Sequence, residues 1–152
     1  KTLADCSKHI KEVNPKLEIT CCVHATINTY YITELRGYDN WETVAACPYF
    51  DVFSTTIINW SLPESFFRDI TERTVAIAKK YGKESERWLM GYNKRPDDWK
   101  QIDKVVDMYE ELGVDRLATW TYRGGYGTSV AAKDALELWD NIGRNYKRVL
   151  KK

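Results

Sequence analysis

Four short β-rich runs, each followed by a helical pattern, constrain the fold of this chain more than any other feature of its sequence. The runs span residues 17–24, 49–58, 87–92 and 116–122. A crossover between parallel strands needs about a dozen residues or more, and it packs on the sheet that it connects. The stretches between the runs are long enough for such crossovers. The spacing therefore predicts an α/β fold with a parallel sheet.

Capping signals and glycines mark the expected helices. Residues 61–64 have the spacing of a capping box, with a proline in the first turn, and Gly82 is expected to end the helix that follows. Residues 96–98 are expected to open the next helix, which Gly113 ends. The last helix is predicted over residues 129–150, from apolar positions at helical spacing.

Four βα units are half of the eight that make a TIM barrel of about 250 residues. We therefore interpret residues 1–152 as a single α/β domain, a parallel (βα)4 half barrel that forms the second half of a (βα)8 barrel. An open doubly wound sheet is the alternative, and it would need helices on both faces. Six Trp and ten Tyr favour the barrel, because aromatic side chains at strand ends suit a ligand-binding mouth.

A half barrel has two open strand edges, so it is expected to pair with a missing N-terminal half barrel or with a homodimer partner. The chain begins at Lys1 without Met, inside an amphipathic helical pattern of Leu3, Cys6, Ile10 and Val13, and we interpret it as a fragment. The formal net charge is +1, which gives no reason to expect nucleic acid as a partner. No apolar run approaches the roughly 20 residues that cross a bilayer, so no membrane is expected.

The four cysteines, Cys6, Cys21, Cys22 and Cys47, show no zinc-ligand spacing, and the sequence predicts no metal and no cofactor. Cys21 and Cys22 are adjacent in a strand, so their side chains should point to opposite faces. Buried free thiols are the favoured interpretation over disulfides. Free thiols are typical of a reducing compartment such as the cytoplasm, but secreted barrels also keep buried thiols, so the compartment stays open.

The residues that follow the strands form the site of a parallel barrel, so the strand tips supply the candidate ligand-binding groups. Hydroxyl, amide and guanidinium groups can exchange hydrogen bonds with sugar hydroxyls, while an aromatic face covers the apolar side of a pyranose. Trp120 is the expected stacking platform. The candidate substrate-binding residues are His24, Thr55, Trp60, Tyr92, Asn93, Trp120, Tyr122 and Arg123.

Residues 86–92, the helix to Gly113 and residues 118–125 resemble the last two βα units of glycoside-hydrolase-like TIM barrels. Residues 41–60 are similar to an earlier unit of the same group, and the resemblance covers most of residues 16–146. It implies a carbohydrate ligand. It also implies an acid/base carboxylate after the fourth strand of the whole barrel and a nucleophile carboxylate after the seventh.

The third run would be that seventh strand, and its tip, residues 90–93, contains no Asp or Glu. Glycoside hydrolysis ordinarily needs two carboxylates about 5 to 9.5 Å apart. Glu86 and Asp115 precede strands and Asp51 lies near the start of one, so these acids are expected at the opposite end of the sheet. The acids that could fold back toward the mouth are Glu34 and Asp39. We therefore expect no catalytic residue in this chain, and hydrolysis only if carboxylates come from a missing half or a partner.

Two other functions stay open. Residues 123–129 hold three glycines that are expected to lead into a helix N-terminus, where backbone N–H groups and Arg123 could cradle a phosphate. Such a loop would indicate a TIM-barrel enzyme that binds a phosphorylated ligand. The third alternative is a non-catalytic half barrel that serves as an assembly module.

Overall fold

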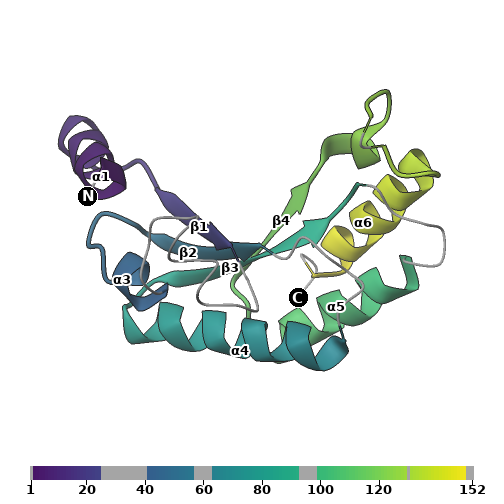
Figure 1. Ribbon diagram of the computed structural model, residues 1–152, viewed down its shortest axis with the longest axis horizontal. Helices are drawn as coiled ribbons and strands as arrows, with labels where there is room; N and C mark the ends of the chain where they lie inside the picture. The colour runs from purple at the N-terminus through teal and green to yellow at the C-terminus, as the bar shows by residue number, and fades with distance from the viewer. Residues whose placement is uncertain (1, 25–40, 57–62, 93–98, 130, 150–152) are drawn as a thin grey trace.

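The computed structural model describes residues 2–24, 41–56, 63–92, 99–129 and 131–149. Four parallel strands form one sheet in the order β1-β2-β3-β4 (Figure 1). The strands are β1 (Thr20–His24), β2 (Val52–Thr56), β3 (Glu84–Met90) and β4 (Arg116–Trp120). The predicted α/β class, the parallel pairing and the sequential strand order are confirmed.

Five α-helices and a 3-10 turn accompany the sheet in the described part of the chain. They are α1 (Thr2–Val13), α3 (Trp41–Ala45), α4 (Glu64–Lys80), α5 (Trp99–Glu111), the turn η2 (Tyr122–Gly125) and α6 (Ala135–Val149). Helices α4 and α5 run beneath the sheet in Figure 1, and α6 packs beside α5. No described helix packs on the opposite face, so this part of the chain is not a doubly wound sheet.

The C-termini of the helices agree with those predicted from the sequence, whereas the N-termini differ from the predictions. Gly82 and Gly113 adopt φ values of +63° and +74° directly after α4 and α5, as their predicted role as helix terminators requires. Helix α4 begins at Glu64 with Pro63 at the N-cap position, and Ser61 of the predicted capping box lies outside the described residues. Helix α6 begins at Ala135, later than expected, because residues 122–128 form turns instead.

Strand β3 begins at Glu84, three residues before the predicted start. Residues 84–86 are polar, but they lie between two strands that pair with them. Glu84 is in register with Val52, and Glu86 with Arg116. Pairing on both sides satisfies the backbone N–H and C=O groups there, whatever the side chains are. This places Glu86 inside the strand.

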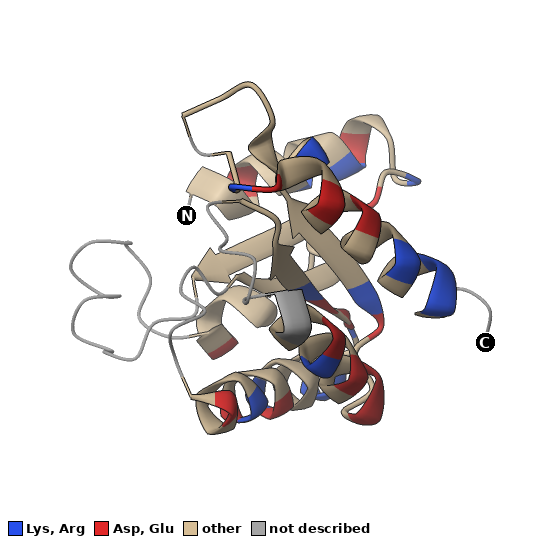
Figure 2. Cartoon of the chain, turned by 90° about the vertical axis from the view of Figure 1, so that its right-hand side faces the viewer, with Lys and Arg blue, Asp and Glu red and all other residues tan. Residues whose placement is uncertain are grey.

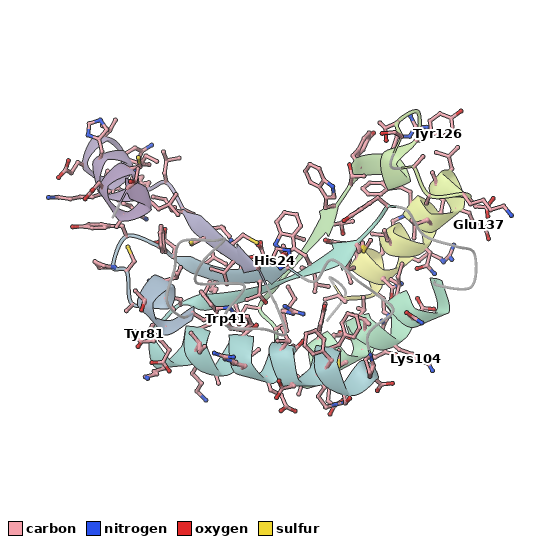
Figure 3. The ribbon with its side chains drawn as sticks, in the orientation of Figure 1. His24, Trp41, Tyr81, Lys104, Tyr126 and Glu137 are labelled. Carbon is pink, nitrogen blue, oxygen red and sulfur yellow. The ribbon has the colours of Figure 1, made fainter. Side chains whose placement is uncertain are left out.

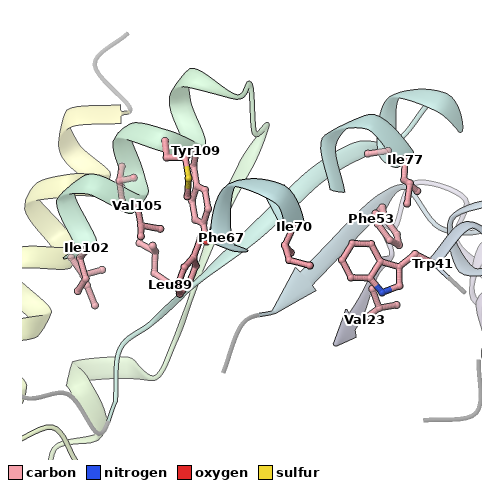
Figure 4. Packing of buried hydrophobic residues seen from close by; sticks show 14 of the residues in the cluster. Val23, Trp41, Phe53, Phe67, Ile70, Ile77, Leu89, Ile102, Val105 and Tyr109 are labelled. Atoms are coloured by element: carbon pink, nitrogen blue, oxygen red, sulfur yellow. The ribbon is translucent and has the colours of Figure 1, made fainter. Parts of the chain in front are cut away.

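The face of the sheet that the helices cover, the covered face, holds the hydrophobic core (Figure 4). Strand residues Val23, Phe53 and Leu89 are almost completely buried. Their helix partners include Phe67, Ile70 and Ile77 of α4 with Ile102, Val105 and Tyr109 of α5. Full burial of one such side chain contributes about 1.5 to 3 kcal/mol, so this layer is the main source of stability in the described chain.

The covered face also holds a buried hydrogen-bonded network around Arg87, which has no exposed surface. Its guanidinium donates to the carbonyl oxygen of Thr55 at 3.1 Å, to the Thr55 hydroxyl and to the Tyr109 hydroxyl at 3.4 Å. The Thr55 hydroxyl also lies 2.8 Å from that of Thr74 on α4. Burial raises the pKa of the Tyr109 phenol, and the charge of Arg87 acts in the opposite direction. The network therefore ties β2, β3, α4 and α5 together through polar groups.

Helix α1 contrasts with the other helices, because its apolar stripe faces outward. Leu3 and Val13 are 70% and 73% exposed, and Ile10 is also exposed. In Figure 1, α1 stands beyond the start of β1, away from the layer of α4 and α5. Lys11 joins it to the sheet by an ion pair with Asp51 at 2.6 Å. The predicted amphipathic helix forms, but its apolar side is open to solvent.

Candidate functional site

The second face of the sheet, the open face, lacks a layer of described helices. Strand alternation and the parallel register determine which side chains point toward it. These side chains are Thr20, Cys22 and His24 of β1, Val52, Ser54 and Thr56 of β2, Glu84, Glu86, Trp88 and Met90 of β3, and Arg116, Ala118 and Trp120 of β4. Polar groups and large aromatic rings share this surface, whereas the covered face is mostly aliphatic and aromatic.

A pocket of about 350 Å³ lies on the open face near the carboxyl ends of the strands. Its lining residues are Cys22, Thr56, Trp88, Leu89, Met90, Tyr92 and Trp120. The walls are largely apolar, with two hydroxyls and one thiol among them, and they include no charged side chain. Trp120 is 60% exposed, which leaves much of its indole available for contact with a ligand.

Trp88 is held on the open face by hydrogen bonds at its indole nitrogen. Its Nε1–H donates to Ser54 Oγ at 2.7 Å and to Glu86 Oε1 at 3.2 Å, and Ser54 Oγ donates to Glu86 Oε1 at 2.7 Å. Ser54 has no exposed surface. Sequence reasoning missed Trp88 as a site residue, although its position two residues before Met90 places it on the same face as that strand tip.

The structure does not bring all the predicted site residues together. Tyr92 and Trp120 line the pocket. His24 ends β1 and is half-buried at the centre of the molecule in Figure 3. Trp60 and Asn93 lie outside the described residues, as do the acids Glu34 and Asp39.

Thr55 is a correction to the predicted site, because it points to the covered face. It is completely buried and contacts Thr74 and Arg87. Its neighbours Ser54 and Thr56 face the open side in its place. The sequence contained a signal for this orientation. Residues i and i+2 of a strand share a face, so Thr55 lies on the same face as the apolar Phe53.

Gly91, between the strand tip Met90 and Tyr92, leaves no room for a ligand, because the protein fills the space beside it. A Cβ atom at Gly91 would lie 3.1 Å from the Thr119 side chain and 3.2 Å from that of Ile142 on α6. The glycine therefore permits close packing between β3, β4 and α6 rather than close approach of a substrate.

Tyr122 and Arg123 lie in η2, directly after β4, and neither lines the pocket. Tyr122 is exposed, and its ring centroid lies 5.2 Å from that of Trp139 in an edge-to-face arrangement. The guanidinium carbon of Arg123 lies 5.8 Å from the ring centroid of Tyr126, which Figure 3 shows at the outer end of this turn.

The glycine-rich turn does not have the geometry of a phosphate cradle. The backbone N–H groups of Gly124, Tyr126 and Thr128 donate to carbonyl oxygens within the turn itself. A Cβ atom at Gly124 would lie 2.5 Å from the carbonyl oxygen of Ala135, so this glycine is needed for contact with α6. The helix begins ten residues after Gly125 rather than directly behind the glycines. Three of the N–H groups that a phosphate could use are thus already bonded within the turn.

Two of the three acids expected at the other end of the sheet lie there. Asp51 accepts a hydrogen bond from Ile19 N at 2.8 Å, and Asp115 accepts one from Ser85 N at 2.8 Å. Each carboxylate satisfies a backbone donor where a neighbouring strand begins. Glu86 is the exception, because β3 starts early, and its carboxylate lies on the open face.

A larger hollow of about 730 Å³ lies where the strands begin. Most of its charged groups have partners within the protein: Arg116 pairs with Glu18 and Glu84, and Lys11 with Asp51. Lys83 donates to the carbonyl oxygens of Cys47 and Phe50, and we interpret the hollow as structural. The aromatic pocket is the better candidate for a ligand site, although it is smaller.

Cys21 and Cys22 point to opposite faces, as predicted. Burial raises the pKa of the Cys21 thiol to about 11. Loss of hydration also raises the pKa of Cys22, and a hydrogen bond with Ser54 acts in the opposite direction. Both are therefore thiols at neutral pH and poor nucleophiles. Among the described residues, no three His, Cys, Asp or Glu side chains gather where they could hold a metal ion.

The surface charges are mixed. Figure 2 shows acidic and basic residues next to each other on the helices of that side. At the basic end of α6, Arg148 pairs with Asp107 at 2.6 Å and with Glu110 at 3.2 Å. Of the helices in the described residues, none has the length and apolar character of a membrane span.

One solved structure with a similar fold is the crystal structure of "a putative alpha-L-fucosidase from Bacteroides thetaiotaomicron", with a TM-score of 0.68. The two sequences are 12% identical, and the match covers 93% of this chain and 47% of that chain. This chain thus spans about half the length of the solved protein. No protein-family model and no curated protein matches the sequence. At this identity the likeness concerns the α/β fold alone.

Proposed function

We propose that this chain is the second half of a glycoside-hydrolase-like (βα)8 barrel. Three observations support the half barrel: the strands follow each other in sequential order, the described helices that pack on the sheet cover one face of it, and the match spans 47% of the solved relative. In a closed barrel the open face would become the interior, and β1 and β4 would each gain a neighbouring strand.

The surfaces left open support a complementary partner. The edges of β1 and β4 carry backbone groups that no described strand pairs, and the outward stripe of α1 adds Leu3, Ile10 and Val13. A helix of this length is marginal in water without a packed apolar side. The proposed partner is the missing N-terminal half barrel, and a second copy of the chain is the alternative. Sedimentation of the isolated chain as a stable, cooperatively folded monomer would contradict both.

The proposed function of the whole barrel is carbohydrate binding at the aromatic pocket. The observation that carries it is the cluster of Trp88, Tyr92 and Trp120 at the carboxyl edge of a parallel sheet, which is where α/β barrels bind ligands. Aromatic faces cover the apolar side of a pyranose, and the hydroxyls of Thr56 and Tyr92 can bind its polar edge.

Hydrolysis would depend on carboxylates from outside the described residues. The pocket lining contains no Asp or Glu, and Glu86 is engaged with Ser54 and Trp88. General acid catalysis needs a carboxyl group within hydrogen-bond reach of the glycosidic oxygen. We therefore expect no glycosidase turnover from residues 1–152 alone. Robust hydrolysis of aryl glycosides by this purified chain would contradict that expectation.

The test is a calorimetric screen of the full-length protein against sugars, followed by Trp120→Ala. This substitution is expected to weaken binding by about 1 to 3 kcal/mol, because a large aromatic contact is lost. Tyr126→Ala is the matched control, since Tyr126 is similarly exposed and does not line the pocket. Equal affinity of the Trp120→Ala variant and the wild type would remove the main support for a sugar site.

The phosphate alternative is weaker, because the turn after β4 uses its own N–H groups. The same calorimeter distinguishes the two functions. Binding of inorganic phosphate that is lost in Arg123→Ala would favour the phosphorylated-ligand enzyme over the sugar-binding barrel. Absence of any ligand would favour the assembly module.

A further inference from the structure

The indole of Trp88 has one polar atom, and the structure directs it away from the pocket. Ser54 and Glu86, the two acceptors of its N–H, do not line the pocket, whereas the Trp88 ring does. The polar edge of the ring is therefore turned down onto the sheet, while apolar ring atoms face the pocket. Packing alone would not select this orientation of the ring on an open surface.

The hydrogen bonds around Ser54 form a directed chain. The Ser54 hydroxyl has one hydrogen, which it donates to Glu86 at 2.7 Å, so the oxygen is free to accept from Trp88 at 2.7 Å. A charged acceptor at the end makes the bond from the hydroxyl stronger than a neutral one. Ser54 is completely buried, so no water competes for its hydroxyl. Cys22 also contacts Ser54, but as a thiol it can donate to the Ser54 oxygen and need not take the hydrogen that Ser54 donates to Glu86.

We propose that Ser54 and Glu86 are positioning residues that hold Trp88 as a preformed wall of the sugar pocket. This inference rests on the proposed carbohydrate-binding function. A ring that is already fixed does not lose rotamer freedom when a ligand stacks on it, which lowers the entropic cost of binding. Removal of either acceptor would release the ring. We expect a loss of sugar affinity of about 2- to 10-fold in Ser54→Ala and in Glu86→Ala.

Nuclear magnetic resonance of the indole N–H groups in the full-length protein tests the positioning directly. Trp88→Phe assigns the Trp88 signal by its disappearance. In Ser54→Ala and Glu86→Ala, this N–H signal should shift and exchange with solvent about tenfold faster or more, because its acceptors are lost. Glu86→Gln keeps an acceptor oxygen and should therefore change the solvent exchange rate of the Trp88 N–H less. The Trp120 signal is the internal control and should stay in place.

An unchanged Trp88 N–H signal in both alanine variants would overturn the proposal. The thermal unfolding midpoint of each variant shows whether the fold persists, and Glu86→Gln is the conservative variant if an alanine variant does not fold. A smaller effect of Glu86→Gln than of Glu86→Ala on both exchange and affinity supports positioning through the acceptor oxygen rather than through charge.

Calorimetry then separates this proposal from the function on which it rests. The probes are the methyl glycosides of fucose, galactose, glucose and N-acetylglucosamine. If Ser54 acts through the indole N–H, Ser54→Ala should weaken binding in the wild-type background and have no effect in the Trp88→Phe background. Failure of the wild type to bind any of these sugars would overturn the sugar pocket and its positioning residues together. Sugar binding that Ser54→Ala and Glu86→Ala leave unchanged would overturn the positioning role alone.

Discussion

The two faces of the sheet are built from the same four strands, yet one face is buried and the other is accessible. On the covered face, Phe53 is 1% exposed and even the cation of Arg87 is completely buried among hydroxyls, a carbonyl and an aromatic ring. On the open face, Trp120 is 60% exposed and a hydrogen-bonded Trp88 borders a pocket. Side chains of similar chemistry thus contribute to stability on one face and are available to a ligand on the other.

The difference shows what a layer of helices does to a parallel sheet. Where α4 and α5 lie against the strands, apolar burial and satisfied polar groups determine the structure. Where no described helix lies, aromatic rings stay accessible and need hydrogen bonds, such as those of Trp88, to keep one orientation. The following substitutions test this division by pairing one residue on each face.

The largest contrast is expected between two aromatic residues. Phe53→Ala should lower the free energy of unfolding by about 3 to 5 kcal/mol, because it leaves a cavity in the core. Trp120→Ala should lower it by less than about 1 kcal/mol, because an exposed ring loses little burial on truncation. Chemical denaturation of both variants in the full-length protein measures the difference. Comparable losses would mean that the open face is as much a part of the core as the covered face.

The second contrast compares arginines on opposite faces. Arg87→Ala should cost about 2 to 4 kcal/mol of stability, because it removes buried packing and leaves Thr55 and Tyr109 without their donor. Arg116→Ala should cost about 1 kcal/mol or less, since its pairs with Glu18 and Glu84 are partly exposed.

Denaturation at low and high salt checks this pair of arginines. The Arg116 effect should shrink at high salt, whereas the Arg87 effect should persist. Arg87→Met is a second variant to compare with Arg87→Ala, because methionine restores apolar volume without the charge. If Arg87→Ala were as mild as Arg116→Ala, the polar network of the covered face would not hold the layers together.

The smallest contrast uses the adjacent thiols and alkaline pH. The pKa of Cys21 is raised from 9.0 to about 11 in the folded protein, so the unfolded thiol loses its proton first. The contribution of the protonated Cys21 thiol to the free energy of unfolding is therefore complete below about pH 9, and it is lost as the pH rises toward about 11. Over that range the free energy of unfolding should fall by about 1 to 2 kcal/mol more in the wild type than in Cys21→Ala.

Denaturation curves at a series of pH values measure this dependence on Cys21. Cys6→Ala is the control, since Cys6 is exposed on α1 and should leave the profile unchanged. A thiol reagent adds a second measurement: Cys22, which is exposed, should react slowly in the folded protein, and the buried Cys21 only after unfolding. Equal reaction rates would show that β1 does not separate the two faces.

Much of the fold follows from the sequence, because its determinants are local. The spacing of the β-rich runs required parallel crossovers, and the structure has four parallel strands in sequential order. Gly82 and Gly113 end their helices because a left-handed residue is needed there and glycine adopts that conformation without strain. The alternation of side chains along a strand separated Cys21 from Cys22. Tyr92 and Trp120 were predicted as site residues from their places at strand tips, and both line the pocket on the open face.

Only the tertiary structure decided the features that depend on neighbouring elements. Strand β3 starts at Glu84 because β2 and β4 pair with it there, and this brings Glu86 to the open face beside Ser54 and Trp88. The outward stripe of α1 likewise depends on which elements lie next to it. Periodicity specifies which side chains share a face of a strand or helix. Which face is covered depends on contacts between segments far apart in the chain, and that decides what is core and what is site.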